Sequence, residues 1–178
     1  MSRTRVLIAE DNDELAALIA DWLAPDYDVR VATDGREAVE RFDESVDVTL
    51  LDRRMPGLSG DEVLDRIRDE HADVRVGMVT AVEPDFDVLA MGFDDYVVKP
   101  VLEPDVVGLV RRLESLSDYD DTMAEYYRLA STLATLEEAK SDAELDASDE
   151  YAAARERLRA VRERADRTLD LESTDRLF

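Results

Sequence analysis

Glycine and proline, the residues that most strongly interrupt regular structure, are confined to the first part of this 178-residue chain. All five prolines lie at or before Pro104, and all six glycines lie at or before Gly108. The last 70 residues therefore contain no strong helix breaker, and we expect them to be almost entirely helical. We place a domain boundary near residue 116, which gives an N-terminal domain at 1–116 and a helical segment at 117–178.

The first part alternates between the hydrophobic periods of strands and of helices. Five short apolar runs are predicted as strands, at 6–9, 29–31, 48–51, 74–79 and 96–98. Apolar residues at helical spacing predict helices at 15–23, 38–42, 60–70, 86–91 and 103–113. Alternating strands and helices predict an α/β fold, in which a parallel sheet has helices on both faces.

Acidic residues outnumber basic ones by 45 to 22, and the formal net charge is −23. Arginine supplies 20 of the basic residues, and the only lysines are Lys99 and Lys140. The excess carboxylates repel one another in dilute salt, but this repulsion is screened at molar salt, where the Debye length is about 3 Å. The composition therefore favours a halophilic protein over an ordinary acidic one, and it disfavours broad binding to nucleic acid.

Several classes of site and location are excluded or disfavoured by what the sequence lacks. Without cysteine there is no disulfide, thiol catalysis or thiolate zinc site, and a single histidine, His71, disfavours histidine-based metal sites and triads. No apolar run approaches the roughly 20 residues of a membrane span, and the N-terminus has no secretory signal pattern. We therefore expect a cytoplasmic protein with no membrane segment.

Polar residues follow four of the predicted strands at their carboxyl ends. Glu10 and Asp11 follow the first strand, Asp52 the third, Thr80 the fourth and Lys99 the fifth. Because ligands bind outside the carboxyl ends of open parallel sheets, we expect these groups to converge. Neighbouring carboxylates repel unless a cation joins them, and Mg²⁺ prefers oxygen ligands and recruits phosphate. A carboxylate beside Mg²⁺ can also be a nucleophile that forms an aspartyl phosphate.

Four motifs around these residues resemble the receiver domain of two-component response regulators. They are Ala-Glu-Asp-Asn at 9–12, the run from Asp52 through Met-Pro-Gly at 55–57 to Gly60, Val-Thr-Ala at 79–81, and the run from 92 to the Lys-Pro pair at 99–100. The resemblance covers about residues 4–116. It implies a flavodoxin-like receiver with sheet order 2-1-3-4-5, and a response regulator in a phosphorelay. Such a protein takes part in its own phosphotransfer and slow dephosphorylation and is otherwise not an enzyme.

The resemblance also implies roles for the matching residues. Asp52 would accept a phosphoryl group from a sensor histidine kinase. Asp11 and Asp52 would bind Mg²⁺ directly, with Glu10 acting through water and the main-chain carbonyl of Arg54 as a further ligand. Lys99 would pair with the phosphoryl group.

Further residues would act in switching and in the lifetime of the phosphoryl group. Thr80 would hydrogen-bond the phosphoryl group, and Tyr96 would swing inward when Thr80 moves. A cis peptide bond is expected before Pro100. For Arg54, two residues after Asp52, two interpretations stay open: it lies over the phosphoryl group and impedes hydrolysis, or it pairs with a surface acid.

The C-terminal segment contains two amphipathic stretches too short for a long coiled coil, which predicts an antiparallel helical hairpin. The stripes that we expect to face each other are Tyr126, Leu129, Leu133 and Leu136 on one helix and Leu158, Val161 and Ala165 on the other. Ser141 with Glu144, and Ser148 or Asp149, are candidate helix N-caps. The segment resembles HalX, a short helical output module found behind receivers in haloarchaea.

Two interpretations of the function of this segment are open. Arg155, Arg159 and Arg162 share one helix face, which suits a phosphate-contacting stripe in a DNA-binding transcriptional regulator. A solvated face with the pairs Arg159–Glu163 and Arg162–Asp166 is the favoured reading, because residues 115–178 hold 17 acidic and 9 basic residues. We therefore expect a homodimer or another signalling protein as the partner of the helices, and DNA is disfavoured.

Two other functions compete with the phospho-accepting receiver. One is a receiver-like interaction module that works without phosphate, which the intact set of polar residues disfavours. The other is a phosphatase with an aspartate nucleophile, which typically needs a second acid at the position that Arg54 occupies.

Overall fold

The structure is a computed structural model that describes residues 3–71 and 73–175. The chain divides into two compact units, the first made of Met1–Glu83 and Met91–Ser117 and the second of Pro84–Ala90 and Asp118–Phe178. In the described part of the chain, no helix combines the length and the apolar character needed to span a bilayer.

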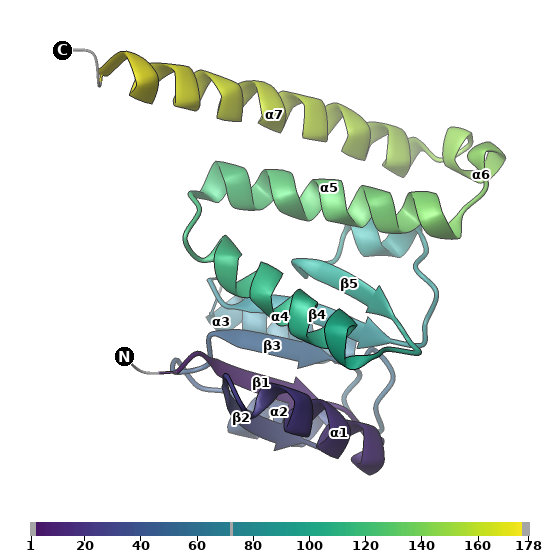
Figure 1. The fold of residues 1–178 in the computed structure, drawn as a ribbon. Helices are drawn as coiled ribbons and strands as arrows, with labels where there is room; N and C mark the ends of the chain where they lie inside the picture. The colour runs from purple at the N-terminus through teal and green to yellow at the C-terminus, as the bar shows by residue number, and fades with distance from the viewer. Residues whose placement is uncertain (1–2, 72, 176–178) are drawn as a thin grey trace. The chain divides into compact units, whose positions relative to one another are not determined.

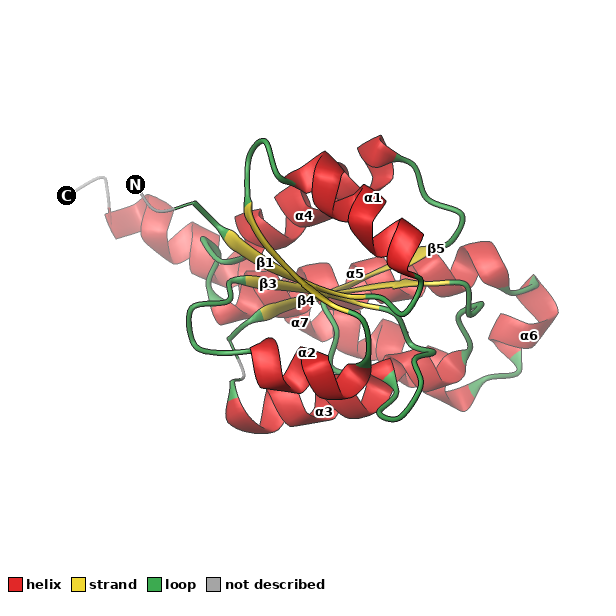
Figure 2. Cartoon of the chain, turned by 90° about the horizontal axis from the view of Figure 1, so that it is seen from below, coloured by secondary structure: helices red, strands yellow, loops and turns green. Residues whose placement is uncertain are grey.

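The first unit is built around a five-stranded, all-parallel sheet with the order β2-β1-β3-β4-β5 (Figure 1). The strands are β1 (Arg5–Ala9), β2 (Asp28–Ala32), β3 (Val48–Leu51), β4 (Arg75–Thr80) and β5 (Asp95–Val98). Helices α1 (Asp13–Leu23) and α4 (Glu103–Leu116) cover one face, and α2 (Gly35–Arg41) and α3 (Gly60–Glu70) cover the other (Figure 2). The predicted α/β fold and strand order are confirmed.

Burial on both faces explains why the central strands are almost continuously apolar. Every residue of β3 is buried, and Val6 through Ala9 of β1 are at most 1% exposed. Helices α1, α2 and α3 each begin with a capping side chain that accepts a backbone N–H of the first turn. The capping residues are Asn12, Asp34 and Ser59. The order of the strands reverses between β1 and β3, so the carboxyl ends of these two strands form the topological switch point of the sheet.

The connection between β4 and β5 differs from the sequence prediction. The helix expected at 86–91 is a single 3₁₀ turn, η1 (Phe86–Leu89). This turn packs against helices of the second unit, so residues 84–90 belong to that unit although the strands on either side belong to the first. Smaller differences are that β4 begins at Arg75 and that α4 continues to Leu116.

The second unit contains α5 (Asp121–Ala139), α6 (Asp142–Asp146) and α7 (Asp149–Asp175) in addition to η1. Helices α5 and α7 run antiparallel and pack on each other, which confirms the predicted hairpin (Figure 1). Ser141 and Glu144 form the predicted capping box at the start of α6. Ser148 Oγ accepts the N–H of Tyr151 at 3.1 Å and so caps the first turn of α7.

The stripes predicted to face each other are buried to different degrees. Leu133, Leu136, Val161 and Ala165 are buried, with Leu136 0% and Val161 1% exposed. Tyr126, Leu129 and Leu158 are only partly buried. The hairpin therefore has a narrow apolar seam, with its outer edges open to solvent.

Candidate functional site

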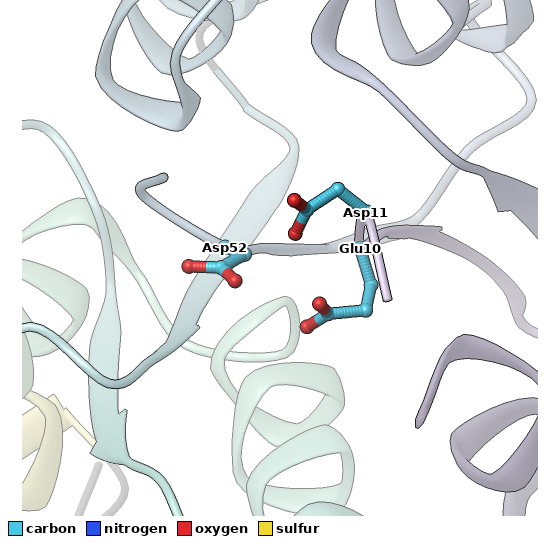
Figure 3. Close-up of side chains that lie close together, drawn as sticks. All are labelled: Glu10, Asp11 and Asp52. Atoms are coloured by element: carbon cyan, nitrogen blue, oxygen red, sulfur yellow. The ribbon is translucent and has the colours of Figure 1, made fainter. Parts of the chain in front are cut away.

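The polar residues predicted to converge come from the carboxyl ends of adjacent strands. Glu10 and Asp11 follow β1, and Asp52 follows β3, whose last residue pairs with Ala9 in the sheet register. Figure 3 shows the carboxylates of these three residues gathered at this edge. One oxygen from each lies within 4.8 Å of the others.

This group of oxygens suits a hard divalent cation. Glu10 and Asp52 are buried, whereas Asp11 is exposed and leaves the cluster open to solvent on its side. The ligands are all carboxylate oxygens, which Mg²⁺ prefers, and the open side leaves room for water or phosphate oxygens. The chemistry of the donor set therefore fits the expected Mg²⁺.

Lys99 brings a positive charge to the cluster. Its ammonium donates a hydrogen bond to Asp52 Oδ2 at 2.8 Å and another to Glu10 Oε2. Burial by itself would lower the pKa of Lys99, but the bonds to the two carboxylates outweigh burial, and the pKa is raised. Burial raises the pKa of Glu10, and the neighbouring ammonium offsets only part of that effect.

The backbone around Asp52 is fixed by several contacts. Asp52 Oδ1 accepts the N–H of Arg54 at 3.2 Å, which brings the main chain of Arg54 beside the cluster. The loop after β3 closes on itself, because the N–H of Gly60 donates to the carbonyl of Arg53 at 2.9 Å. A Cβ atom at Gly60 would lie 2.0 Å from the carbonyl oxygen of Asp52, so no larger residue fits where α3 begins.

Of the predicted switch residues, Thr80 is the last residue of β4 and Tyr96 is the second residue of β5. Thr80 is fully buried, and its Oγ1 accepts the N–H of Val82 at 3.2 Å. The hydroxyl of Tyr96 donates to the carbonyl of the same Val82 at 2.6 Å, and Tyr96 as a whole is 5% exposed. Tyr96 is thus in an inward position, and the expected swing between two positions stays a prediction. The expected cis bond between Lys99 and Pro100 is present.

The two arginines after Asp52 have different surroundings. Arg53 forms a two-pronged ion pair with Asp61, with distances of 2.9 and 2.8 Å. The side chain of Arg54 is exposed and has no ion pair within the described residues. One interpretation of Arg54 was that it pairs with a surface acid, but it is the neighbouring Arg53 that makes such a pair.

Some contacts near the site were not anticipated from the sequence. Glu10 Oε1 accepts the N–H of Asn12 at 3.1 Å, so the cap of α1 also orients an acid of the cluster. Asp94, directly before β5, is buried, and its carboxylate accepts from the N–H of Val76 at 2.8 Å and from Arg68 at 2.9 Å. The sequence signal for these contacts was the pair of acids, Asp94 and Asp95, directly before an apolar strand. An acid at such a position is expected to be buried, and a buried acid requires hydrogen-bond or ion-pair partners.

The arginines of α7 also pair differently from the prediction. Arg157 and Arg164 both bind Glu125 of α5, at 2.6 and 2.9 Å, and Arg159 binds Glu156 at 3.0 Å. Within the described residues, the expected partners Glu163 and Asp166 take part in no ion pair.

Comparison with known proteins agrees with the two segments that the motifs define. Residues 6–111 match the response regulator receiver domain, and residues 115–178 match the HalX domain. A provisionally named transcriptional regulator of Haloferax volcanii is 44% identical over 158 residues, covering 88% of this chain and 27% of that protein. The sensory transduction protein RegX3 of Mycobacterium tuberculosis is 36% identical over 124 residues, covering 67% of this chain and 54% of that protein. The chain thus spans about half or less of the length of these relatives.

Solved structures share the fold of the first unit. The signal receiver domain of a provisionally assigned Luxo repressor from Vibrio parahaemolyticus has a TM-score of 0.61 and 26% identity, over 65% of this chain and 93% of that one. The response regulator TrrA of Thermotoga maritima, in complex with Mg²⁺ and BeF, has a TM-score of 0.57 and 30% identity, over 62% of this chain and 98% of that one.

Proposed function

Because the chain belongs to the receiver family of two-component response regulators, with a HalX domain behind the receiver, we propose that Asp52 accepts a phosphoryl group from a sensor histidine kinase. The observation that carries the proposal is the meeting of Glu10, Asp11 and Asp52 with the ammonium of Lys99, 2.8 Å from Asp52 Oδ2. In the transfer, a carboxylate oxygen of Asp52 attacks phosphorus, an O–P bond forms, and the N–P bond of the phosphohistidine breaks.

Mg²⁺ would be held by Asp11 and Asp52, by Glu10 through water, and by the main-chain carbonyl of Arg54. When bound, it would neutralise charge on the incoming phosphoryl oxygens. Lys99 already contacts Asp52, so a small movement would bring its ammonium onto a phosphoryl oxygen. Thr80 lies at the end of the next strand, where its hydroxyl is available to turn from Val82 to the phosphoryl group.

The test is labelling with a small phosphodonor in the presence of Mg²⁺. The protein should gain one phosphoryl group, stable in acid and labile in base, and Asp52→Asn should abolish it. Asp47→Asn, at the opposite end of the same strand, is the matched control and should be labelled like the wild type. Full labelling of Asp52→Asn would mean that another residue is the acceptor.

The same experiment separates this function from its competitors. A receiver-like module that works without phosphate would take no label. A phosphatase with an aspartate nucleophile would release phosphate over many turnovers, whereas we propose slow dephosphorylation of the protein's own aspartyl phosphate. The phosphodonor is an intracellular protein in this proposal, so the chain would act in the cytoplasm.

The helical unit is the proposed output, acting through protein contacts. A groove of about 360 Å³ runs between α5 and α7, with Leu133 and Leu158 in its lining and Arg155, Arg159 and Arg162 along one side. Three arginines and one acid, Glu137, line the groove together with apolar side chains, so its net positive charge suits an acidic protein surface, such as a second copy of this acidic chain or another signalling protein. DNA is the second candidate, and a titration against duplex DNA at two salt concentrations would detect it as binding that weakens steeply with salt.

A further inference from the structure

The connecting segment between β4 and β5, residues 84–90, is structurally a part of the helical unit. The turn η1 within it packs against both α5 and α7, which follow it in sequence by more than 30 residues. Val88 is 1% exposed, and Pro84 is also buried. The connecting segment therefore contributes apolar side chains to the core of the helical unit.

Lys140 fixes the connecting segment to the end of α5. Its ammonium lies 3.0 Å from Asp85 Oδ1 and 5.5 Å from the centre of the Phe86 ring. Asp85 also accepts the N–H of Phe86 at 2.9 Å, so the same carboxylate starts the 3₁₀ turn and receives the lysine. The hydrogen bond from Lys140 lowers the pKa of Asp85, which keeps the carboxylate charged.

The choice of lysine at this position supports a specific role for it. Only two of the 22 basic residues are lysines, and the other is Lys99 in the phosphorylation site. The single ammonium of Lys140 lies over a ring and beside a carboxylate at once. An exposed ion pair is weak, so the apolar residues supply most of the attachment and Lys140 sets its position.

The N-terminal end of the connecting segment lies close in sequence to the switch residue Thr80 and to Val82, which contacts both switch residues. Val82 accepts the hydroxyl hydrogen of Tyr96 and donates its N–H to Thr80, and both contacts lie within the first unit. Only Glu83 separates Val82 from Pro84, where the second unit begins. Because consecutive Cα atoms are 3.8 Å apart, one intervening residue has little slack to absorb a displacement.

We propose that the connecting segment carries the phosphorylation state of Asp52 from Thr80 and Val82 to helices α5 and α7, with Lys140 as the positioning residue that couples it to them. The inference rests on the proposed function, since it needs a phosphoryl group to move Thr80. When the hydroxyl of Thr80 turns to that group, the N–H of Val82 loses its acceptor and the start of the connecting segment shifts. Contacts of Pro84, Asp85 and Val88 pass that shift to α5 and α7.

The test is hydrogen–deuterium exchange of the full chain, with and without Mg²⁺ and beryllofluoride as a phosphoryl mimic. In the wild type, the mimic should change exchange in three peptides, covering residues 52–60, 84–90 and 121–139. In Lys140→Met the change at 52–60 should remain, and the change at 121–139 should fall at least threefold. Arg157→Met is the matched control, because it removes an ion pair between α7 and Glu125 of α5 that does not involve the connecting segment.

A charge exchange provides a second variant that keeps the pair. Asp85→Lys combined with Lys140→Asp should restore the response at 121–139, whereas Asp85→Lys alone should lose it. Undiminished transmission in Lys140→Met, or an equal loss in the Arg157→Met control, would overturn the inference. A wild type that responds at 52–60 but not at 121–139 would refute the inference alone. No response at 52–60 would refute the proposed function, and the inference with it.

Discussion

Replacing Gly60 with alanine tests how tightly the start of α3 is packed against the acidic cluster at Asp52. The added Cβ would lie 2.0 Å from the carbonyl oxygen of Asp52 and 2.8 Å from the Cα of Arg53. Both neighbours are backbone atoms, so no side-chain rotation relieves the overlap, and β3 or α3 must shift by about 1 Å. Overpacking of this kind costs about 1–3 kcal/mol, and we expect the upper end of that range.

The stability effect is measurable by thermal unfolding. The first unit has about 110 residues and its own core, so 1 kcal/mol corresponds to about 4 °C, and Gly60→Ala should lower the Tm of this unit by about 12 °C. The site should be affected as well, because Mg²⁺ tolerates little departure from octahedral geometry at about 2.1 Å. Displacing Asp52 or the carbonyl of Arg54 by about 1 Å should weaken Mg²⁺ binding at least tenfold, as measured by calorimetric titration.

Gly57 in the same loop provides the control. Its φ is +79°, and a Cβ there would meet no atom within 4 Å. Alanine at Gly57 should therefore cost only the backbone strain of about 1–2 kcal/mol and leave Mg²⁺ affinity unchanged. If Gly60→Ala kept the Tm and the Mg²⁺ affinity of the wild type, the argument that the close approach at Gly60 holds the site together would be wrong.

Three further predictions concern the switch, the charge and the hairpin. Lys99→Arg should uncouple phosphorylation from the conformational change more than it lowers labelling, because the fork cannot reach the same oxygen; normal coupling by hydrogen exchange would contradict this. The Tm should rise steeply between 0.1 M and 1 M KCl, as the Debye length falls from about 10 Å to about 3 Å; a flat Tm would remove the halophilic argument. Leu133→Asp should unfold the helical unit, because it places an unpaired charge at a position that is 3% exposed. The circular dichroism signal at 222 nm should fall while Asp52 is still labelled; full helicity would show that the position tolerates solvent.

The fold of the first unit and the members of its acidic cluster were predictable because both depend on short-range patterns. The apolar runs define the strands, and parallel strands bring the residues that follow them to one edge, as observed for Asp11 and Asp52. The capping box at Ser141 was predictable for the same reason, since its partner is three residues away.

Contacts between distant residues could not be predicted in this way. The pair between Asp85 and Lys140 spans 55 positions, and no periodicity in either segment indicates it. The same holds for Arg68 and Asp94, whose ion pair depends on how α3 meets the sheet. The local pattern also predicted a helix at 86–91 where the structure has a single 3₁₀ turn. The apolar residues of this turn belong to the core of the second unit, and one turn is enough to place them there.

The discontinuity of the helical unit has a consequence for the order in which the chain folds during synthesis. Strand β5 follows the connecting segment within a few residues, so the sheet can close soon after residues 84–90 leave the ribosome. Val161 of the seam emerges 73 residues after Val88, which at 5–20 residues per second is about 4–15 s later. The receiver can therefore fold first with Val88 uncovered, and the nascent hairpin would then close over a loop that is already anchored at both ends.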